Sequence, residues 1–369
     1  QLTRLKVRII SPKGNVKEYY YDDLKITYDP KIGTDKFAIE GLEIGCEVEL
    51  LCTYRNGIVA TAREYFQHRF PINKMRFELT PHNYLSYLVK TYNGLGNAEL
   101  SEGKIVIADS NIVGLTTENI SSVRAKVKRL DYKLKDYPGD KDYLTWESIA
   151  NRKLSDYQLN SGGKKIDKFL ESLHLDSLSL DDKLYRIESE IKETIAYKFQ
   201  GYNENRNLGT ILKEKLADNI GMLALYMKCF KQLDVDVHLM FASSRKLGEI
   251  DMYFPHEMDL SVPLFYFPEI DKYICPFQNY MRLGYPHAEI AGSMAFSIKT
   301  TSAPLSLGYY YDSYEFKKLP LYSSNISKVK TTNYVAFNEE LDGLKIKYRN
   351  SKTGYDAFFV RYLHHLEEV

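Results

Sequence analysis

The sequence predicts an α+β protein of several domains: an antiparallel β-sandwich-like domain, then an α+β core, then a second β-domain. Short strand-like runs separated by Gly, Asn and Pro fill the chain up to about residue 130. Helical periodicities followed by alternating runs fill the middle, and tyrosine-rich alternating runs return from about Thr300. We therefore expect domains at 1–135, 136–298 and 299–369.

Composition excludes several classes of protein. The chain has 369 residues, and 50 Lys and Arg against 49 Asp and Glu leave a net charge of +1, so charge does not direct it to nucleic acid or to an anionic membrane. With 44% hydrophobic residues it can bury a substantial core. Its apolar runs fall far short of the ~20 residues that span a bilayer. It begins at Gln1 without a signal-like segment, so we expect that a leader has been removed or left out.

The first region reads as strands joined by turns. Leu5, Val7 and Ile9 alternate with basic residues, the period-two pattern of a half-buried strand. Pro12-Lys13-Gly14-Asn15 predicts a turn after it. Further strands are expected at 47–54, 75–79, 104–108 and 123–130.

The middle region reads as helices followed by strands. A helical region begins at Trp146, and a clear amphipathic helix begins at Asp181, with its apolar positions recurring at spacings of three and four. We expect a second long helix from about Thr210 to Leu233. Strands are then expected at 235–241, 262–267 and 272–275.

Four cysteines are present, at positions 46, 52, 229 and 275. This is far too few for a disulfide-built scaffold, and no Cys-x-x-Cys pair suggests zinc or a redox centre. The count is compatible with one catalytic thiol. His364 and His365 are adjacent and cannot share a face of a regular helix or strand. We expect neither a metal nor another cofactor.

Several short motifs follow one another in the middle region. Ala217-Asp218-Asn219 precedes a Leu-rich stretch, and Phe241-Ala242-Ser243-Ser244-Arg245 ends a predicted strand. Leu260-Ser261-Val262 and Tyr273-Ile274-Cys275-Pro276 come next. In order and spacing they resemble the Gly-Asp-Cys helix entry, the Ser-Thr-Arg strand end, and the Phe-Asn-His and Leu-Leu-Asp-Ala elements of the papain-like transglutaminase core.

The flanking regions extend this resemblance over nearly the whole chain. Residues 42–51 and 66–71 look like the β-domain of unknown function that precedes such cores in many Bacteroidetes proteins. Residues 342–344 and 353–361 look like the start of the β-domain that follows them. The resemblance implies export to the periplasm, the cell surface or the medium.

The family's chemistry uses a thiol at a helix N-terminus, a histidine that takes its proton and a carboxylate that orients the histidine. Carried over by the resemblance, these positions hold Asn219, Val262 and Cys275. None of these side chains can perform its role. The resemblance therefore implies a transglutaminase-like protein that has lost its catalytic triad, with a cleft at Asp218, Asn219, Arg245 and Cys275 that binds a peptide, protein or glycan.

Two alternatives stay open at this point. Cys275 could act with a loop histidine, His256 or His287, in a rearranged cysteine acyltransferase or peptidase, although surface positions are expected for both histidines. The chain could also be a purely structural module with a filled cleft. Separately, the triplets Tyr19–Tyr21 and Tyr309–Tyr311 predict exposed rings, because neighbours on a strand point to opposite faces.

Overall fold

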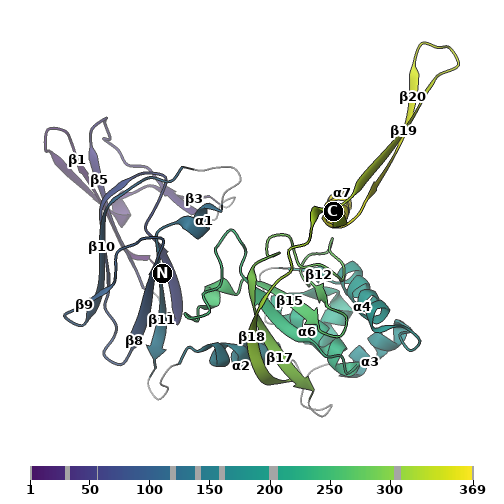
Figure 1. The fold of residues 1–369 in the computed structure, drawn as a ribbon. Helices are drawn as coiled ribbons and strands as arrows, with labels where there is room; N and C mark the ends of the chain where they lie inside the picture. The colour runs from purple at the N-terminus through teal and green to yellow at the C-terminus, as the bar shows by residue number, and fades with distance from the viewer. Residues whose placement is uncertain are drawn as a thin grey trace. The chain divides into compact units, whose positions relative to one another are not determined.

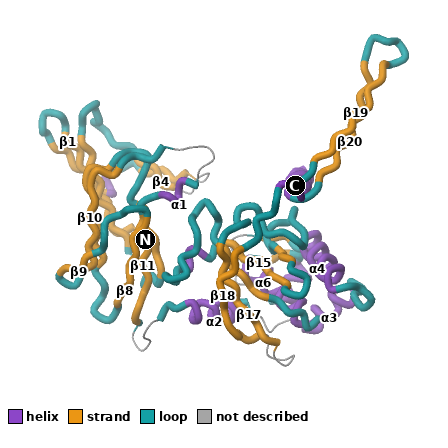
Figure 2. Tube along the Cα trace, in the orientation of Figure 1, coloured by secondary structure: helices purple, strands orange, loops and turns teal. Residues whose placement is uncertain are grey.

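The computed structural model describes residues 2–29, 34–55, 57–116, 122–137, 143–157, 163–198, 207–302 and 309–367. They form two compact units, Gln1–Val59 and Ala60–Val369. Helices and strands are mixed, and several antiparallel sheets dominate (Figures 1 and 2). This confirms the mixed, strand-rich character that the sequence predicts. In the part of the chain that is described, no helix combines the length and the apolar character needed to span a membrane.

The first unit is built on a three-stranded antiparallel sheet. Strand β1 (Leu2–Ile10) lies between β2 (Val16–Tyr20) and β5 (Glu47–Tyr54). Its alternating side chains Leu5, Val7 and Ile9 are buried, so the predicted strand is confirmed. The predicted turn is also confirmed, with Gly14 at φ 82°. The 3-10 turn η1 (Tyr21–Asp23) and the hairpin of β3 (Ile26–Asp29) and β4 (Thr34–Phe37) complete this unit.

Two tyrosines of this unit have exposed rings, as predicted. Tyr20 is 48% exposed and Tyr21 is 50% exposed. The side chains of Tyr309 and Tyr310 in the second triplet lie outside the described residues, whereas Tyr311 is half-buried.

The second unit begins with two three-stranded antiparallel sheets. One contains β7 (Ile72–Leu79), β10 (Lys104–Ile112) and β9 (Glu99–Ser101), and the other contains β6 (Thr61–Tyr65), β11 (Arg129–Asp136) and β8 (Ser86–Tyr92). The strand predicted at 123–130 is wrong, because Val123–Lys126 forms the short helix α1 and β11 begins only at Arg129. Arg129 and Asp131 are buried, which the apolar–polar pattern does not anticipate.

In the described residues between β11 and the central sheet, the helices are α2 (Trp146–Asp156), α3 (Gly163–Ser172), α4 (Leu180–Thr194), α5 (Leu208–Glu214) and α6 (Asn219–Gln232). Helix α4 confirms the predicted amphipathic helix. The continuous helix predicted from Thr210 to Leu233 is wrong. It is interrupted because Lys215 adopts the left-handed region at φ 57° and β13 (Leu216–Ala217) pairs with β12 (Ala196–Tyr197).

A five-stranded antiparallel sheet forms the centre of this unit, in the order β16-β15-β14-β17-β18. Its strands are β14 (His238–Ala242), β15 (Val262–Phe267), β16 (Lys272–Ile274), β17 (Met294–Ser302) and β18 (Tyr309–Lys318). The predicted domain boundary after residue 298 falls within β17. The three-domain division stays a prediction.

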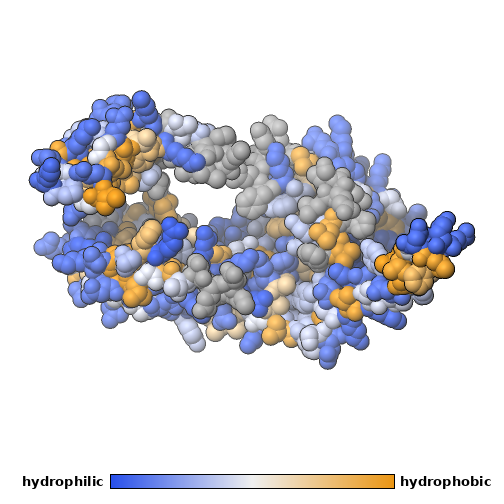
Figure 3. All heavy atoms as spheres, turned by 90° about the horizontal axis from the view of Figure 1, so that it is seen from above, coloured by the Kyte–Doolittle hydropathy of each residue, from blue (hydrophilic) through white to orange (hydrophobic). Residues whose placement is uncertain are grey.

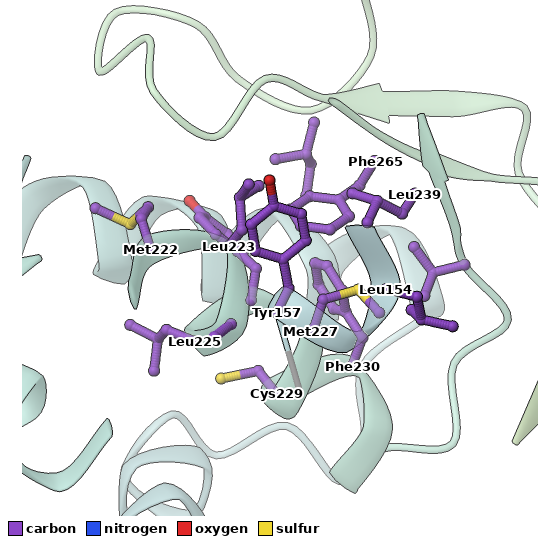
Figure 4. Packing of buried hydrophobic residues seen from close by; sticks show 14 of the residues in the cluster. Leu154, Tyr157, Met222, Leu223, Leu225, Met227, Cys229, Phe230, Leu239 and Phe265 are labelled. Carbon is purple, nitrogen blue, oxygen red and sulfur yellow. The ribbon is translucent and has the colours of Figure 1, made fainter. Parts of the chain in front are cut away.

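The two faces of this sheet are covered differently. Leu239, Phe241 and Phe265 belong to the cluster that the helices cover, where they pack with Phe230 and Trp146. Figure 4 shows Phe230 of α6 beside Phe265 and Leu239 of the sheet. We call this side the helical face.

The residues that alternate with them form a second cluster on the opposite face. Met240, Leu264 and Cys275 belong to it, and Met281 from a loop and Phe358 from α7 (Tyr355–Glu367) pack against them. We call this side the loop face. The segment expected to begin a β-domain, at residues 353–361, enters α7 instead of a strand, and the assignment of that domain stays a prediction.

An extended hairpin connects the 3-10 turn η4 (Ser324–Ile326) to α7. It consists of β19 (Val329–Phe337) and β20 (Leu344–Lys352), which form a two-stranded sheet and pair with no other described strand. Phe337, Ile346 and Tyr348 are more than half exposed. Figure 3 shows patches of hydrophobic side chains between hydrophilic ones on the molecular surface.

A buried ion-pair network ties the second unit's first strands to its core. Arg63 of β6 donates to both carboxylate oxygens of Asp131 of β11, at 2.6 and 2.7 Å, and to Asp259 of the 3-10 turn η3 (Glu257–Asp259), at 2.7 Å. The side chains of all three are at most 2% exposed. Burial raises the pKa of Asp259, and the Arg63 guanidinium opposes that rise.

Replacing one carboxylate of this network is expected to destabilise the protein strongly. Asp259→Ala leaves Arg63 buried with only Asp131 as its partner, and we expect a loss of ~3 kcal/mol in the free energy of unfolding. Glu78→Ala, which removes an ion pair with exposed Arg76, is the matched control and is expected to change stability little. Urea unfolding of both variants measures this, and equal losses would contradict the importance of the buried network.

Candidate functional site

The N-terminus of α6 is where the resemblance places the reactive thiol. Asp218 is buried and its carboxylate accepts a hydrogen bond from the Gly221 amide at 2.7 Å, so it is the N-cap of the helix. Asn219 follows as the first helical residue and is exposed. The predicted helix entry is therefore in place. The carboxylate of Asp218 is used to cap the helix. The exposed side chain at the next position, Asn219, is an amide.

The other two triad positions lie on the loop face of the central sheet. Val262 is half-buried and packs against the cluster that contains Cys275, which follows β16. Within the described residues, the side chain of Asn219 makes no hydrogen bond with either of them. The structure thus brings Val262 and Cys275 to one cluster, while Asn219 stands at the exposed start of α6.

Cys275 is sealed in this cluster. It is 1% exposed, and its sulfur lies 3.9 Å from the carbonyl oxygen of Tyr285. Burial raises the pKa of its thiol to about 12, although the nearby Lys192 ammonium acts in the opposite direction. A thiol in this state is almost entirely protonated at neutral pH and is therefore a poor nucleophile.

Beside Cys275 the loop face opens into a cavity of about 250 Å³. Its walls are mostly aromatic, and we call it the aromatic pocket. It is lined by Tyr280, Met281, His287, Ala288, Tyr355, Phe358 and Tyr362. The rings of Tyr280 and Tyr362 meet edge to face, with centroids 5.3 Å apart.

Sequence reasoning missed most of this pocket. Three of its rings come from α7, at positions 355, 358 and 362. The spacing of three and then four is a helical signal that could have found them. A contact between α7 and the loop near residue 280 joins segments about 75 residues apart, which no local pattern reveals.

His287 orders the hydrogen bonds inside the pocket. Its Nδ1 accepts from the Glu289 amide at 3.3 Å, so the neutral ring carries its proton on Nε2. Nε2 lies 3.1 Å from the Tyr280 hydroxyl and donates to it. Burial lowers the pKa of His287, which keeps the ring neutral near pH 7. The Tyr280 hydroxyl proton is then left to donate to a bound group.

Arg245 lies next to the pocket, where it contacts the lining residue Ala288. Its Nη2 donates to the carbonyl oxygen of Ala288 at 2.6 Å, and its charge acts on the Tyr355 hydroxyl to lower the pKa, against the larger effect of burial. In the part of the chain that the structure describes, its Nε and Nη1 groups have no protein acceptor. Of the four predicted cleft residues, Arg245 and Cys275 therefore lie beside the pocket, and Arg245 offers free donors.

A buried ion pair on α4 forms hydrogen bonds with the backbone of the loop that carries the pocket residue Met281. Lys192 donates to Glu188 at 2.5 Å and to the carbonyl oxygen of Met281 at 3.1 Å. The other carboxylate oxygen of Glu188 accepts from the Leu283 amide. Both charged side chains are at most 1% exposed. Burial lowers the pKa of Lys192, and the Glu188 carboxylate opposes this.

Asp131, His256 and Asp259 form a buried group whose ligand atoms lie within 4.8 Å of one another. The surface position expected for His256 is wrong, because this side chain is fully buried and its Nε2 bonds to the carbonyl oxygen of Ala62 at 3.0 Å. Arg63 pairs with both carboxylates and Arg129 lies 3.6 Å from Asp131, so two positive charges already balance the two negative ones. A divalent cation here would leave an uncompensated buried charge, so the arrangement fits a structural ion-pair network better than a metal centre.

Comparisons with known proteins give a similarity of fold. No protein-family profile matches the sequence, and no curated protein matches it. A solved structure of a "putative protease" from Parabacteroides distasonis ATCC 8503 superposes with a TM-score of 0.54 at 13% identity. The match covers 84% of this chain and 61% of that one, so this chain spans less than two thirds of that protein. At this identity the likeness concerns the fold alone.

Acidification is expected to destabilise the wild type more than a His256→Gln variant. An unfolded histidine titrates near pH 6.5, whereas burial lowers the pKa of folded His256, with Asp131 and Asp259 opposing this shift and Arg63 adding to it. Below about pH 6.5 the unfolded chain binds a proton that the folded chain does not, so stability falls as pH drops. At about pH 5.5 the cost is at most ~1.4 kcal/mol.

Urea unfolding of both proteins at neutral and at mildly acid pH measures this difference. Gln keeps a side-chain donor for the Ala62 carbonyl, so the comparison isolates the titration of His256. The same pH dependence in both proteins would contradict the assignment.

Proposed function

We propose that this chain is a transglutaminase-like protein without thiol chemistry, which binds a peptide, protein or glycan through the aromatic pocket. The proposed arrangement is an N-terminal β-domain, an α+β core and a C-terminal β-domain, and the proposed place of action is outside the cytoplasm, after export. Support comes from the motif order in the sequence and from the similarity in fold to a bacterial protein named as a protease. The proposal does not include the catalytic activity of transglutaminase-like enzymes.

The observation that carries this proposal is the state of the thiols. The exposed residue at the start of α6 is Asn219, which has no ionisable proton at neutral pH. In the same unit, Cys229 and Cys275 are at most 1% exposed, and burial raises the pKa of both. A nucleophilic thiol needs an accessible, electropositive setting that lowers its pKa. Neither of these cysteines has one.

The alternative is a cysteine-dependent acyltransferase or peptidase that uses Cys275. The fold-level neighbour is named as a protease, and His287 lies in the pocket beside Cys275. Yet the hydrogen bonds of His287 go to Tyr280 and to the Glu289 amide, and Cys275 points to the carbonyl oxygen of Tyr285. A binding role accounts for these contacts better than a catalytic one.

Thiol labelling tests the proposal. In the native protein at neutral pH, Cys275 is expected to react ~1,000-fold more slowly than an ordinary exposed thiol, because a pKa of about 12 leaves little thiolate. Half-buried Cys46 and Cys52 are expected to react first. The measurement is mass-spectrometric mapping of iodoacetamide labelling over time.

Two variants control the labelling experiment. Cys52→Ala is expected to remove an early label, whereas Cys275→Ala is expected to remove none. Fast, saturable labelling of Cys275 that persists at mildly acid pH would overturn the proposal and favour the enzyme.

A further inference from the structure

The size and walls of the aromatic pocket limit what it can take. Pockets for drug-sized ligands measure roughly 300–1,000 Å³, and this cavity has about 250 Å³. That suits a single large apolar group. The walls offer ring faces and edges from Tyr280, Tyr355, Phe358 and Tyr362. Such surfaces pack well against another aromatic ring or an aliphatic chain.

Charge around the pocket favours an anion beside that apolar group. Arg245 lies next to the pocket, and Arg361 lies over the ring of Phe358, with its guanidinium carbon 5.6 Å from the centroid. The nearby carboxylate of Glu289 is paired with Lys246 at 2.7 Å. The Glu289 carboxylate therefore does not neutralise the positive charge of the two arginines. An arginine with free donors can bind a carboxylate through two parallel hydrogen bonds.

The pocket also provides a neutral donor. Since His287 donates to the Tyr280 oxygen, the Tyr280 hydroxyl can give its own proton to a ligand oxygen. Lys192 and Glu188 form hydrogen bonds with the backbone at Met281 and Leu283. These bonds hold the loop that carries Tyr280 in place. A ligand would therefore meet an already ordered set of groups, which lowers the entropic cost of binding.

We propose that the aromatic pocket binds a carboxylate that carries a large apolar group next to it, with the apolar group between the rings and the carboxylate on Arg245. This rests on the proposed binding function and names its ligand class. The same chemistry occurs at the C-terminus of a peptide that ends in an aromatic residue and in a medium-chain fatty acid. The fit to a single ring favours the peptide end.

Isothermal titration with small probes tests this. N-acetyl-L-phenylalanine is expected to bind about tenfold more tightly than its amide, because only the acid carries a carboxylate that forms an ion pair with Arg245. Arg245→Gln is expected to reduce this ratio to about one while the affinity for the amide stays unchanged. Arg76→Gln, at an exposed arginine of β7, is the matched control and is expected to leave the ratio unchanged.

Decanoate separates the two sources. Tighter binding of N-acetyl-L-phenylalanine than of decanoate supports the peptide end, and the reverse supports the fatty acid as the source of the same carboxylate. Ala288→Trp fills the pocket from its exposed rim and is expected to abolish binding of every probe. Urea unfolding of each variant verifies that it folds.

Two results would overturn the inference, and they have different consequences for the pocket. Equal affinity for the acid and the amide in the wild type removes the carboxylate specificity but leaves a binding pocket. Failure of all probes to bind the wild type overturns the inferred ligand class, whereas the proposed function is overturned only by fast labelling of Cys275.

Discussion

The buried pair of Glu188 and Lys192 on α4 is the interaction on which the candidate site depends. Two charges removed from water are costly unless every remaining hydrogen-bonding group finds a partner. Here those partners are backbone groups of the loop that follows β16, at Met281 and Leu283. The pair therefore fixes that loop, and the loop carries Met281 and Tyr280 into the pocket wall.

The alternation of side chains on the central sheet explains why the pocket is separate from the helical core. Ile274 packs on the helical face, while Tyr273 and Cys275 belong to the loop face. Cys275 is thus committed to a second, smaller core that α7 and the loop close. Burial there raises the pKa of the Cys275 thiol. The accessible surface of the pocket is formed mostly by aromatic rings instead.

Local patterns predicted much of the fold and little of the site. The strand at Leu5 to Ile9 and the stripe of α4 were predictable, because one face of each is apolar and the other polar. The same pattern did not predict Arg129 and Asp131, because they are charged and buried, and Asp131 pairs with Arg63, which is distant in sequence. The break at Lys215 depends on pairing with β12, which is a tertiary contact. Likewise, the sequence predicted Arg245 as a cleft residue. It could not predict that the aromatic rings of α7 lie near Arg245, because tertiary contacts bring these distant segments together.

The most direct test of a non-catalytic pocket is a crystal structure of the protein grown with N-acetyl-L-phenylalanine. The account predicts density for the ring inside the aromatic pocket, against its lining rings, with the carboxylate about 3 Å from the guanidinium of Arg245. Density beside Asn219 at the start of α6, or a covalent adduct on Cys275, would contradict it.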